Sequence, residues 1–520
     1  MAATKQTWTL EGESELRLEV DFDAVVVVVL KQGLCEVLGV ELAAGREYAF
    51  AGAKVAFYSW HGCQLETRGE CASVYQTGPG ETTAAAALNA HSYLETRRDE
   101  ASRAVSAAVA GGVLRCCEGA SRAGAAPVAE GASALAPALA AFAAGAGEDS
   151  CGRDCRGPRV MVVGPSDSGK STLAATLLGY AARLGREPTF VELDPALGDC
   201  GAPPGAVAAA RVTRETLSVD EGFGSLDCAP LSYWFGYEAP REHPDLYARV
   251  VDELAVAVAE KLDGDRSANV AGLVVATSSW VDGDGFASLL RVASAFAVDA
   301  VLVLAHDRLF ADLRQALPPS VAVAKLPRSG GVVQRDVVHR RRARHRKIHE
   351  YFYGPQSHAR SLLAKRDDDA ALDKLLEATA PPLAPATHEL PFRAVRVFKV
   401  LAGSKGDDSM LPVGQGSMLE PLQVVAVTVS PVLVHNVLAV CHPAKDGDDA
   451  GDDDEHDDAA ADAATSPHQH LLGCAAAGFV VVTNVNVEAQ TITLLGPCSG
   501  DLPSRNLLLG KLEWMESNIA

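Results

Sequence analysis

The sequence lacks the features that place a chain in a membrane. No stretch offers the roughly 18 uninterrupted apolar residues of a transmembrane helix, and the Ala-rich segment 134–146 is short and broken by Pro137. The N-terminus also lacks a charged segment followed by an apolar one, the pattern of a secretory signal. We therefore expect no membrane partner.

The sequence also lacks paired metal-binding cysteines. Its 12 cysteines are scattered, and no two of them form a C-x-x-C pair. Cys151 and Cys155, near Cys116 and Cys117, do not complete a zinc-ligand spacing. Free thiols in a reducing, intracellular compartment are the simpler interpretation.

Positive charge is scarce overall but locally concentrated. The formal net charge of −21 argues against a general affinity for nucleic acid. Residues 445–462 contain ten acidic residues and one lysine, whereas residues 335–347 contain seven lysines or arginines and one aspartate. Because salt screens distant charges, the basic segment can still bind phosphates.

One stretch carries a specific motif. GPSDSGKST at residues 164–172 satisfies the pattern G-x-x-x-x-G-K-[ST] in full. Residues 159–163 before it predict a short buried strand, and residues 173–178 after it open a predicted helix, so backbone N–H groups are aimed at an anion. Lys170 is expected to reach the β- and γ-phosphates, and the Ser171 hydroxyl to bind Mg²⁺. A chance match in a Gly/Ser-rich turn is the alternative, and both flanks argue against it.

The patterns of strands and helices predict three domains. Residues 1–97 contain short strands, including the β-branched run Val25–Leu30, and predict a β-sandwich or small barrel. Residues 158–355 alternate strands with helices and predict a doubly wound parallel sheet. Residues 385–520 are again β-rich. The expected fold class is α/β, with a central P-loop NTPase domain flanked by two β domains.

Three segments are expected to connect or interrupt these domains. Residues 98–157 are rich in Ala, Gly, Ser and Arg, and burial of so few large apolar side chains cannot offset their ordering entropy. Only some of residues 96–109 are expected to be helical. Residues 356–384 form a second linker, and the acidic segment 445–463 predicts a solvated, disordered loop.

Asp194 ends the predicted strand 188–194. In a doubly wound sheet the carboxyl ends of neighbouring strands share one crevice, so Asp194 can face the γ-phosphate. There it can hold Mg²⁺ or accept a proton from an attacking hydroxyl. Capping of a turn that contains Pro195 is the alternative.

The basic segment and one tryptophan suggest further site residues. Arg340 and Arg344, at i and i+4 of a predicted helix, can both point at the γ-phosphate as a lid. A nuclear-localisation signal or a generic RNA patch remains open for the same run. Trp280 follows the predicted strand 270–276, where its ring can stack on a flipped-out base. Packing of this ring in the core is the alternative.

These residues resemble those of a known family. The resemblance is carried by ESELR at 13–17, GAKVA at 52–56, WHGC at 60–63, residues 158–172, 189–194, 279–281, 329–333 and 350–354, and GFVVVT at 478–483. They are similar to the polynucleotide 5′-hydroxyl kinase subunit of the pre-mRNA cleavage and polyadenylation machinery (cleavage factor II). That family also includes RNA kinases associated with the tRNA-splicing endonuclease.

The resemblance implies that ATP lies between the first and central domains. The implied nucleotide-binding residues are Glu15 and Lys54 on the adenine side, and Gly164, Asp167, Ser168, Gly169, Lys170, Ser171 and Thr172 at the phosphates. Ser171 and Asp194 would hold Mg²⁺. Asp194 would act on the RNA 5′-hydroxyl, Trp280 would clasp a base, and Arg340 and Arg344 would assist Lys170 as the lid.

One position departs from the family pattern. Active members usually follow the aspartate with x-Gly-Gln, whereas this chain has Asp194-Pro195-Ala196-Leu197. Leu197 cannot offer the amide that glutamine would bring to the metal or to the nucleophile. The departure matters because some members of the family bind ATP without kinase activity.

The resemblance therefore implies an ATP-dependent polynucleotide 5′-hydroxyl kinase of the nucleus that acts on the 5′ end of RNA. Its implied partners are other subunits of the cleavage and polyadenylation complex, with the tRNA-splicing endonuclease as a further candidate. The alternative is a catalytically inactive, ATP-bound scaffold subunit. A GTPase is disfavoured because the chain has no motif specific for guanine.

Overall fold

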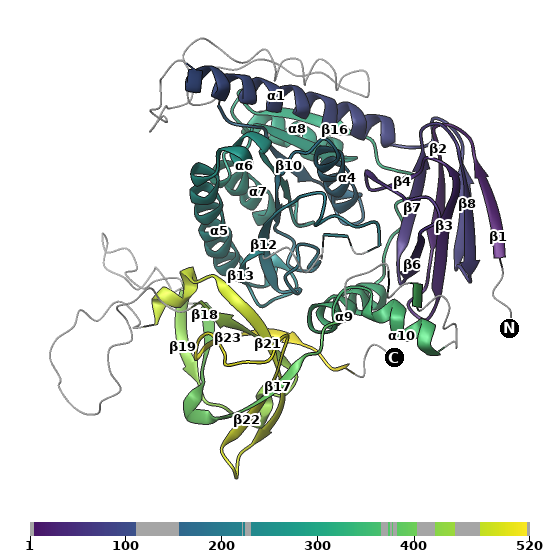
Figure 1. The fold of residues 1–520 in the computed structure, drawn as a ribbon. Helices are drawn as coiled ribbons and strands as arrows, with labels where there is room; N and C mark the ends of the chain where they lie inside the picture. Colours follow the sequence, from purple (N-terminus) through teal and green to yellow (C-terminus); the bar gives the residue numbers. More distant parts are fainter. Residues whose placement is uncertain are drawn as a thin grey trace.

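A computed structural model gives the fold of most of the chain (Figure 1). It describes residues 5–110, 155–220, 222–223, 230–365, 373–374, 377, 382–402, 422–442 and 468–516. The predicted acidic loop at 445–463, and residues 111–154 of the predicted insertion, lie outside the described residues. Among the described helices, none combines the length and the apolarity needed to cross a bilayer.

The first domain is a β-sandwich, as predicted. Its two sheets have the strand orders β1-β8-β3-β6 and β5-β4-β7-β2-β9. The strands are β1 (Lys5–Leu10), β2 (Ser14–Glu19), β3 (Val25–Gly33), β4 (Glu36–Val37), β5 (Val40–Glu41), β6 (Glu47–Ala51), β7 (Lys54–Ser59), β8 (Cys63–Gly69) and β9 (Ser73–Thr77). Alternate residues such as Leu16, Val28 and Leu65 fill the space between the sheets.

Strand β3 is covered on both faces, which explains its continuous run of valines. Val26 and Val28 belong to the sandwich core. Val25 and Val27 pack instead against Leu363 of helix α10 (Ser357–Lys365). Part of the segment predicted as the linker 356–384 is therefore a helix that packs on the first domain.

Helix α1 (Ala84–Ala110) runs through residue 97, where the sequence placed the end of the first domain. Residues 98–110 thus continue this helix, which agrees with the expectation that part of 96–109 is helical. Leu94 belongs to the same core as the central sheet. Arg98 is 1% exposed, and its Nε donates to the Ala271 oxygen at 2.8 Å. Figure 1 shows α1 lying across the central domain beside α4.

The central domain contains a seven-stranded sheet with the order β13-β12-β11-β14-β10-β15-β16. Strands β11, β14, β10, β15 and β16 are parallel neighbours, as predicted. The elements are β10 (Arg159–Val163), α4 (Lys170–Arg183), β11 (Thr189–Glu192), β12 (Ala206–Arg211), β13 (Leu231–Trp234), α5 (Pro244–Gly264), α6 (Arg266–Ala271), β14 (Leu273–Ala276), α7 (Asp284–Ala295), β15 (Ala300–Leu304), α8 (Asp307–Ala316), β16 (Ala322–Leu326) and α9 (Val337–Tyr353).

Two strands of this sheet were not predicted. β12 pairs antiparallel with both β11 and β13. Its sequence AVAAAR is dominated by alanine, which has a low strand propensity, so the pattern gave no signal. The chain just before this strand packs closely on the last domain, since a Cβ at Gly205 would lie 2.4 Å from Leu512.

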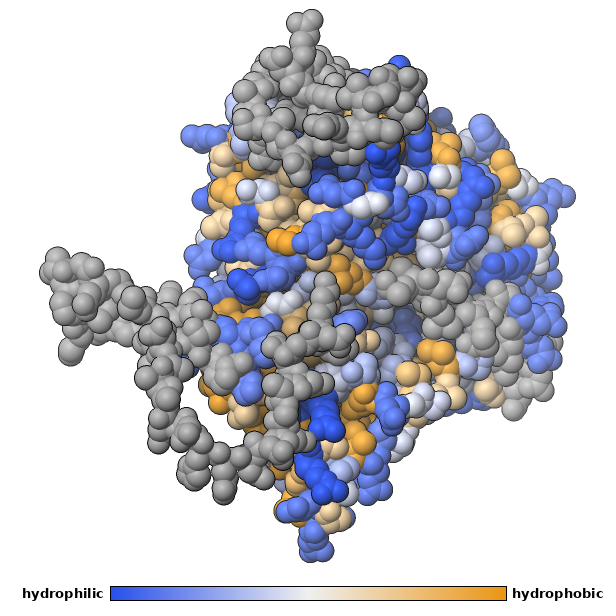
Figure 2. Space-filling model, turned by 60° about the vertical axis from the view of Figure 1, so that its left-hand side comes forward, coloured by the Kyte–Doolittle hydropathy of each residue, from blue (hydrophilic) through white to orange (hydrophobic). Residues whose placement is uncertain are grey.

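The described part of the last domain contains a seven-stranded sheet with the order β17-β22-β21-β20-β23-β18-β19. Its strands are β17 (Ala386–Pro391), β18 (Arg396–Ala402), β19 (Leu422–Val427), β20 (Asn436–Cys441), β21 (Ala476–Asn486), β22 (Thr491–Gly496) and β23 (Asn506–Glu513). Trp234 of β13 contacts Phe479 of β21, with ring centroids 5.4 Å apart, and joins this domain to the central one. Figure 2 shows hydrophilic and apolar residues interspersed over one face of the molecule, as is usual for a folded surface.

Glu36 joins the first domain to the phosphate-loop helix α4. Its side chain is 5% exposed. Tyr180 donates its hydroxyl to Glu36 Oε1 at 2.6 Å, and Arg183 Nη1 donates to Oε2 at 2.7 Å. The backbones also touch, because a Cβ at Gly179 would lie 2.4 Å from the Leu38 oxygen. The strand β4 is thereby fixed against the helix that begins at the phosphate loop.

We predict that replacing Glu36 by Gln lowers the free energy of unfolding by about 2 kcal/mol, because the hydrogen bonds that this buried side chain accepts from Tyr180, Arg183 and Trp60 are weakened. The urea midpoint of the full chain measures this effect. Glu41→Gln is the matched control, since Glu41 also pairs with Arg183 but is 51% exposed. We expect the control to change stability little. Equal effects of the two substitutions would contradict the role given to Glu36.

We also predict a pH-dependent contact between α1 and α4. His91 is 5% exposed and packs against Tyr180, with ring centroids 5.4 Å apart and ring planes tilted by 53°. Burial and the positive charges of Arg98 and Arg183 lower the pKa of His91 to about 4, and the carboxylate of Glu95 opposes this shift. The unfolded chain takes up this proton near pH 6.5, so stability falls as pH falls from 6.5 toward 4.

The slope contributed by His91 is at most about 1.4 kcal/mol per pH unit. His91→Phe is expected to flatten the dependence of the urea midpoint on pH between 6.5 and 5. The same substitution at the exposed His61 is the control for loss of an imidazole away from this contact. An unaltered slope in the His91 variant would show that this histidine is not held neutral.

Candidate functional site

The phosphate-binding motif forms the predicted strand, loop and helix. β10 lies between β14 and β15 and is buried along its whole length. Gly169 ends the loop in a left-handed conformation with φ 95°, and α4 begins at Lys170. A Cβ at Gly164 would lie 2.8 Å from Ser168 Oγ, so close packing requires glycine there. This one turn holds the predicted residues Gly164, Asp167, Ser168, Gly169, Lys170, Ser171 and Thr172.

Two polar groups in this turn fit an anion. Lys170 Nζ donates to the backbone oxygens of Gly164 and Pro165, at 2.9 Å each. Burial lowers the pKa of Lys170, and Asp194 is the largest opposing influence. The Ser168 hydroxyl is 3% exposed and finds no hydrogen-bond partner within the described part of the chain. Such a group costs about 1–3 kcal/mol unless a ligand atom satisfies it, and a phosphate oxygen at a helix N-terminus would do so.

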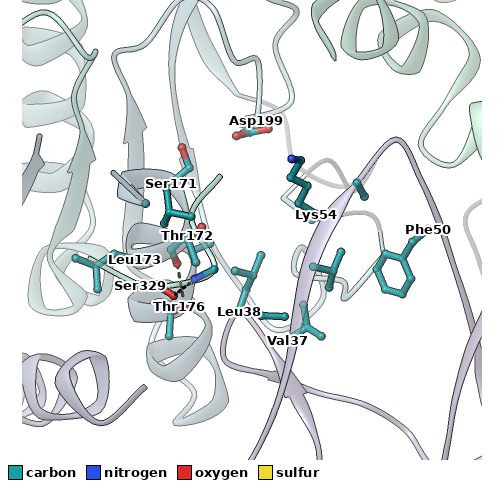
Figure 3. Close-up of a pocket in the computed structure, with 18 of the residues that line it drawn as sticks. Val37, Leu38, Phe50, Lys54, Ser171, Thr172, Leu173, Thr176, Asp199 and Ser329 are labelled. Atoms are coloured by element: carbon teal, nitrogen blue, oxygen red, sulfur yellow. Dashed lines mark hydrogen bonds between the residues drawn. The ribbon is translucent and has the colours of Figure 1, made fainter. Parts of the chain in front are cut away.

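A cavity of about 480 Å³ lies between this turn and the first domain. Figure 3 shows Ser171 and Thr172 of α4 on one side of it, and Leu38 and Lys54 of the first domain on the other. Its volume lies within the range of about 300–1,000 Å³ typical of small-molecule sites. Glu15 also lines the cavity, so both residues that the resemblance placed on the adenine side reach it.

An arginine that sequence reasoning missed supports this wall. Arg17 Nε donates to Glu15 Oε2 at 2.8 Å. Burial raises the pKa of Glu15, and the charge of Arg17 opposes the rise. A Cβ at Gly331 would lie 2.8 Å from Arg17 Nε, which explains the paired glycines at 330–331. Lys54 Nζ lies 3.2 Å from Glu19 Oε2 on the neighbouring strand.

The structure separates the two arginines expected to act as a lid. Arg340 Nη2 donates to Asp167 Oδ2 at 2.6 Å, and the Arg335 backbone N–H donates to the same oxygen at 3.1 Å. Arg340 therefore contacts the phosphate loop through Asp167, and its contact with the γ-phosphate stays a prediction. Arg344 pairs with Glu238 Oε2 at 2.7 Å, on the segment that follows β13. The expectation that both arginines point at the phosphates fails here, because Glu238 offers Arg344 a carboxylate of its own.

Other basic side chains of α9 contact the first domain. Arg342 lies 3.2 Å from Asp23 Oδ1, and Arg346 Nη1 donates to the Ala51 oxygen at 2.6 Å. The helix begins at a capped turn, where Asp336 accepts from the His339 N–H at 2.6 Å. Together with the contact of Arg340 to the phosphate loop, these contacts hold α9 between the first domain and the central domain. They favour the lid interpretation over a freely exposed basic patch.

Asp194 follows β11 and lies close to the phosphate loop. Burial raises its pKa, and the positive charges of Lys170 and Arg340 oppose the rise. Its Oδ1 also accepts from the Ala196 N–H at 3.2 Å, so it caps a turn as well. Within the described residues, no three His, Cys, Asp or Glu side chains converge on a metal position. A metal at Asp194 would therefore need the Ser171 hydroxyl and the phosphate oxygens as further ligands.

Glu192 is a second residue that sequence reasoning missed. It is 3% exposed, and its Oε2 accepts from the N–H groups of Asp199 at 2.8 Å and Cys200 at 3.0 Å. Burial, followed by the charge of Asp199, raises its pKa well above the usual range. An acidic residue at the end of an otherwise apolar strand was the available signal. Glu192 closes the loop that carries Asp194.

Trp280 lies in the loop between β14 and α7, next to the carboxyl edge of the central sheet. It is partly buried, and a Cβ at Gly285 would lie 2.7 Å from its Cγ. Neither Trp280 nor Asp194 is among the residues that line the cavity. The structure thus places Trp280 at the carboxyl edge of the sheet but outside the cavity, and its contact with a base stays a prediction.

Three family profiles match the chain in order. The profile described as the N-terminal beta-sandwich domain of polyadenylation factor matches residues 9–101. The profile of the mRNA cleavage and polyadenylation factor CLP1 P-loop matches residues 164–354. The profile of pre-mRNA cleavage complex II protein Clp1 matches residues 383–516.

Curated relatives match over nearly the whole length. The polyribonucleotide 5′-hydroxyl-kinase Clp1 of Gallus gallus is 34% identical over 508 residues, which cover 98% of this chain and 96% of that protein. The human protein of the same name is 33% identical with the same coverage. A CLP1 homolog of Anopheles gambiae is 32% identical over 520 residues, with 99% of each chain covered.

Solved structures share the fold. A wild-type Clp1p–Pcf11p complex superposes with a TM-score of 0.71 at 19% identity, covering 99% of this chain and 100% of the other. A second structure, which concerns an extended interface between Pcf11p and Clp1p, has a TM-score of 0.71 at 20% identity and covers 99% of each chain. The solved structures show the fold, and the profiles and full-length relatives show that the chain belongs to the Clp1 family of pre-mRNA cleavage complex proteins.

Proposed function

We propose that this chain transfers the γ-phosphate of ATP to the 5′-hydroxyl of a polyribonucleotide. The observation that carries the proposal is the phosphate loop, whose buried Ser168 hydroxyl has no partner among the described residues. This loop shares one cavity with Glu15 and Lys54 of the first domain. The names of the full-length relatives support the same activity.

In the proposed reaction the RNA 5′-oxygen attacks the γ-phosphorus, and the bond to the β,γ-bridging oxygen breaks to release ADP. Asp194 accepts the hydroxyl proton, and its raised pKa brings it nearer to the working pH of a general base. Lys170 and Arg340 offset the negative charge of the transferring group. Ser171 and Asp194 would hold Mg²⁺, which neutralises phosphate charge when it is bound.

Two further residues enter only as proposals. Trp280 would stack on a base at the 5′ end, which its partly exposed place at the sheet edge allows. Arg344 would join the lid only by leaving Glu238, which it contacts at 2.7 Å. The resting position of Arg344 makes it a weaker candidate than Arg340.

We further propose that the chain works in the nucleus with other cleavage-complex subunits. The two solved relatives are structures of Clp1p with Pcf11p, another protein chain. An association with the tRNA-splicing endonuclease is a separate proposal, supported only by the family resemblance.

The kinase proposal predicts that the purified chain transfers label from γ-labelled ATP to an oligoribonucleotide that carries a 5′-hydroxyl. Lys170→Ala removes the charge at the phosphates and Asp194→Asn removes the base, so each should lower transfer by at least about 100-fold. Lys261→Ala, in the last turn of α5, is the control for a lysine away from the loop. If the wild-type protein transfers no more label than the Lys170 variant, the kinase proposal is refuted.

A second candidate function is an ATP-bound scaffold, and Leu197 is the observation that favours it. Leu197 lines the cavity. Its backbone N–H donates to the backbone oxygen of Asp194 at 3.2 Å, which fixes Leu197 in the turn after the proposed base. An apolar side chain at this point offers nothing to a metal or an attacking hydroxyl.

The scaffold reading predicts that ATP and Mg²⁺ raise the melting temperature without turnover, because a ligand of the native state stabilises it. Leu197→Gln should then gain label transfer at least tenfold, while Leu184→Gln, at a leucine 58% exposed, should gain none. Wild-type transfer equal to that of the Leu197 variant would exclude Leu197 as a block. A melting temperature unchanged by saturating ATP would contradict the scaffold reading itself.

A further inference from the structure

The loop after β11 carries a carboxylate for which the reaction above has no use. Asp199 lies two residues beyond Leu197 and lines the same cavity as Ser171 and Lys54. Figure 3 shows its carboxylate pointing into the same end of the cavity as the side chains of those two residues. This end of the cavity is the one formed by the first turn of α4.

Contacts from two elements hold Asp199 in place. Its backbone N–H donates to Glu192 Oε2 at 2.8 Å, and Glu192 is itself buried in the central sheet. Its Oδ1 lies 3.5 Å from Lys347 Nζ of α9. Lys347 also lies 3.3 Å from Glu350, so it keeps a partner when Asp199 turns toward another cation.

Asp199 lies on the same short loop as two other carboxylates. Its backbone N–H donates to Glu192 Oε2, and Asp194 stands five residues earlier in the sequence. The Ser168 hydroxyl, 3% exposed and unpartnered within the described residues, lines the same cavity and independently indicates a polar ligand there. A divalent cation that arrives with the phosphates would give the Asp199 carboxylate a positive charge to bind.

We propose that the Asp199 carboxylate is a ligand of the divalent cation that accompanies the nucleotide, beside the Ser171 hydroxyl. From two residues further along the loop, it supplies the polar atom that Leu197 lacks. Carboxylate and hydroxyl oxygens are the ligands that Mg²⁺ and Mn²⁺ prefer. The proposal rests on the nucleotide binding proposed above and does not depend on phosphoryl transfer.

The test measures metal affinity directly. Mn²⁺ is titrated into the full chain saturated with a non-hydrolysable ATP analogue, and free Mn²⁺ is followed by electron paramagnetic resonance. Asp199→Asn is expected to weaken Mn²⁺ binding by about tenfold, in line with the loss of one supporting ligand. Lys347→Met is expected to keep or tighten it, because the carboxylate loses a competing cation.

A second variant changes the metal preference and not only the affinity. Asp199→Cys places a soft thiolate at the site, so the ratio of Cd²⁺ to Mg²⁺ affinity should rise at least tenfold over wild type. Unchanged Mn²⁺ affinity in Asp199→Asn overturns the proposal. Equal weakening in Asp199→Asn and Lys347→Met also overturns it, because Asp199 would then act only through the ion pair. A chain that shows the expected metal dependence but no label transfer fails the kinase proposal alone.

Discussion

The arrangement of the candidate site depends on the contact between Glu36 and helix α4. Tyr180 and Arg183 both donate to this one buried carboxylate, so the first domain is tied to the helix that begins at the phosphate loop. The cavity has walls from both domains, and this contact is one of those that hold the two walls together. Removing one partner of a buried charge leaves the other uncompensated, which makes the contact costly to break.

A second constraint acts from the opposite side through α9. This helix contacts the phosphate loop through Arg340 and the first domain through Arg346. The basic run that looked like a possible nucleic-acid patch is therefore largely used within the fold. In Figure 1, α9 lies between the first domain and the last domain, close to the chain segments that both provide. The cavity is thus bounded by one helix bound to Glu36 and another bound to Asp167.

Much of this arrangement was predictable, and the exceptions have physical causes. The P-loop and the parallel strands were found because glycine spacing and apolar runs are local signals. Strand β12 was missed because an alanine-rich strand is formed by tertiary packing. Arg344 was misplaced because helical spacing says which face it shares with Arg340 but not that Glu238 lies nearby. Glu36 and Arg17 act across domains, and no local pattern reports such contacts. Glu192 did have a local signal, an acidic residue at the end of an apolar strand, but its partners on the following loop could not be predicted from it.

The central claim is that the loop holding ATP is built to deliver its γ-phosphate to an RNA 5′ end. The most direct measurement compares two oligoribonucleotides of the same sequence, one with a 5′-hydroxyl and one with a 5′-phosphate, incubated with γ-labelled ATP and the purified chain. We expect label on the 5′-hydroxyl RNA only, with one ADP formed for each phosphate transferred. Release of inorganic phosphate without labelled RNA, or no consumption of ATP at all, would contradict the claim.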